Sequence, residues 1–336
     1  MEIGIENLVA FARQLGLAVA GAAALWAFVF LVCSRTCRSD TSQIIFHWIA
    51  GRLQWLMYGG IVLGTTSWLA LSLFYEVFAH EGITLYPTAY EVMAAFPITA
   101  PGYLVLLVLS LVGLTVRWHS PRVFHRYALG YFLAQFLVLL SITSFSSAWS
   151  GEVSAEKAFF VLHSVHSIFT LGTVLVLDFL FLSAKSSRTL QQHIFPLFPW
   201  ISAVIWIGLG IDFLSVALVF DDAVMLTSRF FFSQTVVGIL IINGILLSGP
   251  ITRKILSSLE HGFESIGKRW LLFADIAGTV SITSWSAITF IDFFPEVPLS
   301  YVQLIGIYLT VIAVLFVGHN LWERYDTAEP RLEGRV

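Results

Sequence analysis

Several ionisable and amide side chains lie inside long apolar stretches of this sequence. Asp178 and Asp275 each lie about two helical turns from one end of such a stretch, and Asp212 and Asn243 lie within two others. Acids inside a membrane helix are candidates for functional groups. No lysine or arginine lies in the cores of these stretches, so the acids are suited to carry a proton or bind a small cation. The alternative is a hydrogen-bonded acid that fixes helix packing.

One stretch combines an acid with histidines. His163 and His166 are three residues apart and share a helix face, and Thr170 lies one heptad after His163. Asp178 is about 60° from His163 around a helix. The spacing predicts a polar stripe that could bind b-type haem, a transition-metal ion or a proton. A haem held by two histidines needs a second histidine at the same depth, which no other stretch supplies, and the alternative is a hydrogen-bonded histidine near the membrane interface.

Trp206 is a further candidate for lining a polar pathway. Most of the 11 tryptophans lie near the ends of the apolar stretches, as expected for an aromatic belt at the membrane surfaces. Trp206 lies deeper. Its position therefore favours a role inside a helical bundle.

The elements that position these residues are predicted to be transmembrane helices. Of the 336 residues, 57% are hydrophobic and 12% charged, whereas soluble domains are about 25% charged. The apolar stretches do not alternate and are about 20 residues or longer, which excludes barrel strands. We predict an all-α integral membrane protein with about nine spans. The spans are 7–34, 53–78, 98–117, 126–149, 158–184, 196–220, 229–250, 270–294 and 299–322.

The spans are predicted to form tandem parallel hairpins in one transmembrane domain. Arg52 is separated from Trp68 by the same distance along the chain as Arg269 from Trp285, and each tryptophan follows Thr-Ser. Repeats in the same direction give parallel hairpins. The hairpins are 7–78, 98–149, 158–220 and 229–294, the last helix is 299–322, and the domain 1–325 precedes a tail, 326–336.

The basic residues predict the orientation. All but three of the 18 lysines and arginines (Arg13, Lys157 and Arg229) fall on one side of the predicted spans. The positive-inside rule puts that side in the cytoplasm, with the N-terminus outside and the C-terminus inside. The outer loops are acidic and would attract a cation.

The later part of the chain resembles a family of uncharacterised bacterial polytopic membrane proteins, some of which are fused to a cytochrome b5-like domain. The likeness covers roughly residues 158–320. The hairpin from Arg229 to Lys254 is also similar to the copper-resistance CopD type of membrane protein. These resemblances imply a bacterial inner membrane, and redox work or metal-cation passage. They are carried by His163, Asp178, Val204-Ile-Trp206-Ile-Gly208-Leu209, Ile241-Ile-Asn243-Gly244 and Gly249-Pro250.

Three functions remain open at this point. The first is passage of a proton or small cation between spans five and eight. The second is a membrane redox protein with b-type haem at His163 or His166, and the third is a non-catalytic subunit or assembly factor. The expected partners are the lipid bilayer, a small cation or proton, and a second copy or a redox protein. Nucleotide and protease motifs are absent from the sequence, which favours a protein that is not an enzyme. The basic residues lie in short loops, so nucleic-acid binding is not expected.

Overall fold

The computed structural model describes residues 5–81, 96–148, 155–185, 188–219, 227–258, 268–293 and 298–326. Within these ranges the chain is helical and contains no strand. It divides into two compact units. The first unit comprises residues 1–221 with 292–295, and the second comprises 222–291 with 296–336. The single transmembrane domain expected from the sequence stays a prediction, and most of its tail lies outside the described residues.

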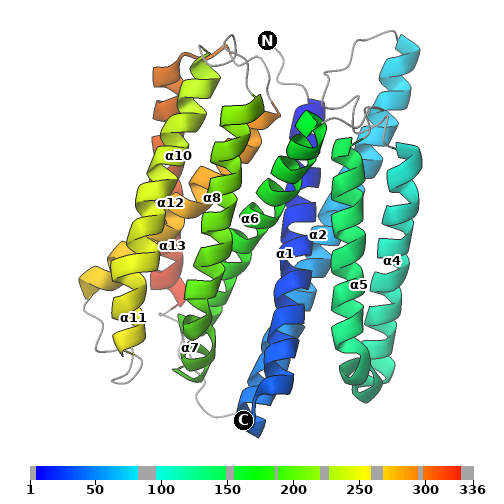
Figure 1. Cartoon of the computed structure of the whole chain (residues 1–336), viewed down its shortest axis with the longest axis vertical. Helices are drawn as coiled ribbons and strands as arrows, with labels where there is room; N and C mark the ends of the chain where they lie inside the picture. Colours follow the sequence, from blue (N-terminus) through cyan, green and yellow to red (C-terminus); the bar gives the residue numbers. More distant parts are fainter. Residues whose placement is uncertain are drawn as a thin grey trace. The chain divides into compact units, whose positions relative to one another are not determined.

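The first unit is built from paired helices that turn at a common end. Figure 1 shows the turns α1–α2, α4–α5 and α6–α7 at the same end of this unit. Ser120 alone separates α4 from α5, and Pro121 begins α5, where a proline is tolerated because its missing N–H has no helical partner. The helices are α1 (Ile5–Thr36), α2 (Asp40–Glu81), α4 (Phe96–His119), α5 (Pro121–Ala148), α6 (Ala155–Lys185), α7 (Arg188–Ile194), the 3₁₀ turn η1 (Phe195–Leu197) and α8 (Phe198–Val219).

Helix α1 forms the centre of the first unit because its buried face is made of small side chains. Ala18, Ala20 and Ala22 have no exposed surface. A methyl group added at Gly60 of α2 would lie 2.7 Å from the Ala20 nitrogen and 2.7 Å from the Gly16 oxygen. A methyl group added at Gly172 of α6 would likewise collide with the Ala18 carbonyl of α1. Small residues let the backbones of α2 and α6 approach α1 closely, which is a common way to associate helices in lipid.

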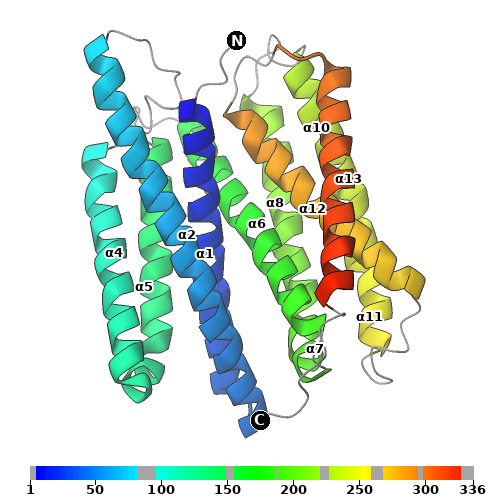
Figure 2. The ribbon, with the colours of Figure 1, turned by 180° about the vertical axis from the view of Figure 1, so that it is seen from behind.

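The described residues of the second unit form four α-helices and one π-helical turn. They are α10 (Ser228–Leu246), the π-turn η2 (Leu247–Ile251), α11 (Thr252–Ser258), α12 (Lys268–Asp292) and α13 (Tyr301–Asp326), and the α-helices are labelled in Figure 2. Phe232, Leu304 and Tyr308 contribute to its apolar core. The hydroxyls of Ser284 and Tyr308 lie 2.7 Å apart and join α12 to α13.

Large apolar side chains point away from both units. Leu104 of α4 is 64% exposed, Ile242 of α10 is 63% exposed and Val302 of α13 is 75% exposed. Lipid is the solvent that accommodates such a surface. Among the described residues, seven helical segments are long and apolar enough to cross a membrane. The chain is therefore an all-α, multi-pass membrane protein, as predicted.

The number of spans stays a prediction. Every predicted span coincides with a helix, but two of these helices are not among the seven segments. These two helices are α6 and α12. Among the residues searched, α6 supplies only a shorter apolar segment, Phe169–Phe181.

Helices extend beyond the predicted ends of their spans, as α2 and the helical path of α10 show. Helix α2 begins at Asp40, so Arg52 lies inside a helix and not in the predicted loop. The helical path of α10 continues past Pro250 to Ser258 through the π-turn. Proline lacks the N–H of a normal helical bond. The Thr252 hydroxyl donates to the Leu247 carbonyl at 2.5 Å, which pairs a carbonyl within this irregular turn.

Candidate functional site

Helix α6 carries four polar side chains into the first unit, and we call them the α6 polar column: His166, Thr170, Thr173 and Asp178. Thr170 and Thr173 are each 1% exposed. The Thr170 hydroxyl lies 2.8 Å from Nε2 of His166. Thr173 accepts a hydrogen bond from the Trp26 indole of α1 at 3.2 Å. Thr170 of the predicted stripe therefore pairs with His166, and the side chain of His163 lies outside the described residues.

A glycine of α8 brings that helix against the column. A methyl group at Gly208 would lie 2.7 Å from the Thr170 hydroxyl and would also collide with His166. The α8 backbone therefore covers this part of the column. Trp206 is half-buried and lies two residues earlier, about 200° around the helix. It is not on the face that Gly208 presents to His166 and Thr170.

Asp178 lies eight residues beyond Thr170, in an apolar part of α6. Its Oδ2 atom is buried and has no hydrogen-bond partner among the described residues. Nearby on the same helix, Leu180 is buried and the Phe181 ring lies 5.8 Å from the Phe195 ring. A buried polar atom without a partner is destabilising. The arrangement indicates that the carboxyl group is completed by a proton, a water molecule or a cation.

The second unit contains two of the predicted site residues, Asn243 and Asp275. The side-chain amide of Asn243 donates to the Ala277 carbonyl at 2.8 Å, and Asn243 is 6% exposed. This bond joins α10 to α12 immediately before the π-turn. Asp275 is half-buried on α12, and its backbone carbonyl accepts from the Thr279 hydroxyl. The bond to Ala277 favours a packing role for Asn243.

Replacing Asn243 by leucine should destabilise the second unit by about 1 kcal/mol, the usual worth of a hydrogen bond between membrane helices. Thermal unfolding of the purified protein measures this. Ile242→Leu, at the adjacent lipid-exposed position, serves as the control and should change little. Unaltered unfolding of the Asn243 variant would show that the bond to Ala277 does not hold the helices together.

His163 and Asp212 lie in helices α6 and α8, but their side chains fall outside the described residues. Their roles stay predictions. Nε2 of His166 lies against Thr170 and the α8 backbone at Gly208, and the haem assignment to His166 stays a prediction. No group of three or more His, Cys, Asp or Glu side chains that could hold a metal occurs in the described part of the chain. We therefore derive no redox step from these residues.

A buried chain of hydrogen bonds between α2, α4 and α5 was missed by the sequence analysis. Gln54 receives a hydrogen bond from Arg117 and donates to the Tyr58 hydroxyl at 2.7 Å. Tyr131 donates to Tyr58 at 2.9 Å, and Gln135 donates to Tyr131 at 3.0 Å. Gln135 also donates to Ser110 at 3.1 Å. The available signal was the pair of glutamines within predicted spans, each with a tyrosine four residues away.

The burial of Arg13 was also missed. Arg13 lies within the predicted span 7–34 and within the candidate span of α1, and its side chain is 4% exposed. Its Nε donates to the Tyr103 hydroxyl at 2.9 Å, and the Tyr103 ring stacks on Trp68 at 4.5 Å. The guanidinium is tolerated because a neighbouring helix supplies an acceptor and an aromatic face.

Comparison of the chain with known protein families, curated proteins and solved structures found no match. The resemblances drawn from the sequence motifs stay predictions. Function is therefore inferred from the residues and their geometry.

Proposed function

We propose that the protein carries a proton or a small cation across the membrane and that Asp178 is the group that binds it. The observation that carries this proposal is the buried Oδ2 atom of Asp178, which lacks a partner among the described residues. Burying such an oxygen is unfavourable, so a bound proton or cation supplies a physical reason for the acid.

The rest of the α6 polar column supplies groups along the same helix. His166 and Asp178 are twelve residues apart, which is about 18 Å of a hydrocarbon core of about 30 Å. The imidazole and the two threonine hydroxyls can each donate and accept hydrogen bonds. Thr173 and Asp178 are about 7.5 Å apart along the axis and about 140° apart around the helix, so passage between them requires water.

The direction of passage follows from the proposed orientation, with the N-terminus outside and the C-terminus in the cytoplasm of a bacterial inner membrane. The turns α1–α2 and α4–α5 lie at one end of the first unit and contain or adjoin several arginines. The positive-inside rule makes that end cytoplasmic. An ion from outside would then reach His166 before Asp178.

Flux into liposomes tests this function. The full chain is reconstituted with a pH-sensitive dye or a sodium-sensitive dye inside, and a potassium diffusion potential drives cation entry. We expect one dye to respond at least tenfold faster than in protein-free liposomes. If neither dye responds faster than in protein-free liposomes, the result would contradict transport. It would favour the alternative of a non-catalytic subunit, which predicts a partner protein that purifies with this chain.

A further inference from the structure

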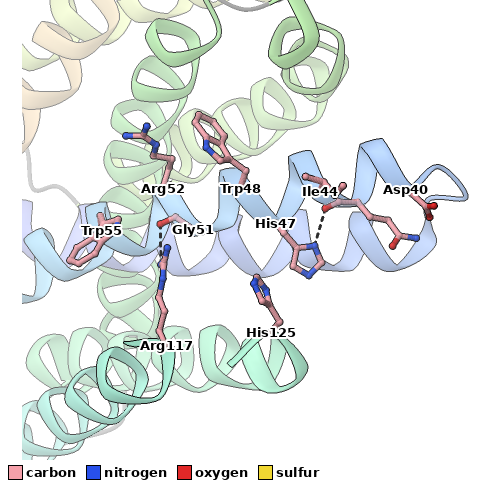
Figure 3. Close-up of a pocket in the computed structure, with 10 residues that line it drawn as sticks. Asp40, Ile44, His47, Trp48, Gly51, Arg52, Trp55, Arg117 and His125 are labelled. Atoms are coloured by element: carbon pink, nitrogen blue, oxygen red, sulfur yellow. Dashed lines mark hydrogen bonds between the residues drawn. The ribbon is translucent and has the colours of Figure 1, made fainter. Parts of the chain in front are cut away.

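A pocket of about 690 Å³ lies along α2 at the same end of the first unit as the basic turns. Figure 3 shows His47 and Gly51 of α2 facing Arg117 and His125 from the neighbouring helices, with Arg52 and Trp48 on the opposite rim. The pocket is open to its surroundings on one side of α2. It is separate from the α6 polar column.

The pocket is positively charged. Arg52 packs over the Trp48 ring at 5.0 Å, and Arg117 packs over the Trp55 ring at 5.8 Å. Neither arginine forms an ion pair with any residue that the structure describes. Asp40 also lines the pocket but lies at its far end, away from both guanidinium groups (Figure 3). The pocket is therefore lined by two arginines and one distant acid, which favours an anionic ligand.

Arg117 is held in position by the chain of hydrogen bonds inside the unit. One of its terminal nitrogens, Nη1, donates to Gln54 and to the Gly51 carbonyl. The N–H groups on Nε and Nη2 have no hydrogen-bond partner among the described residues. A guanidinium fixed at one nitrogen presents its remaining donors in a defined direction, which suits the oxygens of a phosphate group.

Two histidines, His47 and His125, lie on the same wall. Their rings lie 5.2 Å apart. Nδ1 of His47 is oriented by the Gln43 carbonyl at 2.9 Å and the Ser34 hydroxyl at 3.0 Å. The His47 ring lies beside the His125 ring in Figure 3.

The remaining lining is apolar and exposed, which identifies the source of the phosphate. Ile44 is 70% exposed, Trp48 is 41% exposed and Trp55 is 56% exposed. Tryptophan rings with this exposure at a helix end lie at the level of the lipid headgroups. Basic pockets between membrane helices on the cytoplasmic side bind anionic headgroups. We infer that this pocket binds the phosphate of an anionic phospholipid, with Arg52 and Arg117 as the principal contacts.

Native mass spectrometry of the full chain tests the inference. The protein is released from zwitterionic detergent, and phosphatidylglycerol or phosphatidylcholine is added in equal amounts. We expect retention of phosphatidylglycerol in preference to phosphatidylcholine. Arg52→Gln should weaken that retention about tenfold, the value of one charge-assisted hydrogen bond. Arg122→Gln removes an exposed arginine at the same end but outside the pocket, and it should have no effect.

Arg117→Gln should also weaken retention, but it disturbs the buried hydrogen bonds, so Arg52→Gln is the deciding variant. Equal retention by wild type and Arg52→Gln would overturn the site, and so would an equal loss in Arg122→Gln. Inorganic phosphate at millimolar concentration provides the second arm. If it displaces the lipid, the pocket takes a soluble phosphate and the lipid assignment is overturned. If it does not, the lipid assignment is supported.

Discussion

Gly60→Ala should lower the stability of the first unit by about 1–3 kcal/mol, the usual penalty for forcing atoms into a packed interior. The added methyl group would lie 2.7 Å from two backbone atoms of α1, and backbone cannot move aside as a flexible side chain can. The measurement is the midpoint of thermal unfolding in detergent.

Gly59→Ala is the matched control for this prediction. Gly59 lies next to Gly60 on α2, and a methyl group there would have no atom within 4 Å. Alanine favours a helix over glycine by up to about 1 kcal/mol, so this variant should be as stable as wild type or slightly more stable. Equal destabilisation by the two substitutions would show that α1 and α2 do not approach through Gly60.

Asp178→Leu should raise the stability of the first unit by about 1–2 kcal/mol, because it removes a buried oxygen that lacks a partner. Residues kept for function often reduce stability, and their replacement then stabilises the fold. Thermal unfolding of the purified variant gives the sign of the change.

Thr173→Val provides the contrast on the same helix. It removes the hydrogen bond that Trp26 donates and should lower stability by about 1 kcal/mol. If Asp178→Leu instead lowers stability as Thr173→Val does, the carboxyl group makes a packing bond. The argument for an ion-binding acid would then fail.

The helices could be predicted from sequence because a membrane span needs a long apolar stretch whatever its neighbours are. Stretch length does not locate the ends of helices outside the hydrocarbon core. Helix α2 extends back to Asp40 since its backbone bonds continue through polar residues near the membrane surface. That extension places Arg52 on a helix face, and the pocket beside it could not be foreseen.

The polar residues of α6 could be identified from the sequence, but the contacts of the polar residues could not. Asp178 and His166 were identified because such groups are rare in apolar stretches. The pairing of Thr170 with His166 depends on side-chain direction, which spacing alone does not give. Tyr58 and Tyr131 meet across two helices, and neither residue stands out in the sequence until its partner is known. The burial of Arg13 likewise depends on Tyr103 from another helix.

The most direct test of the central proposal is the rate of ion entry into liposomes that contain Asp178→Asn or wild-type protein at equal density. The substitution preserves shape and removes the group that binds a proton or cation. Asp292→Asn, at an exposed position, controls for the change in charge. We predict that Asp178→Asn reduces entry to the rate of protein-free liposomes and that Asp292→Asn matches wild type. Unchanged entry in Asp178→Asn, with wild-type entry above background, would contradict the assignment of Asp178.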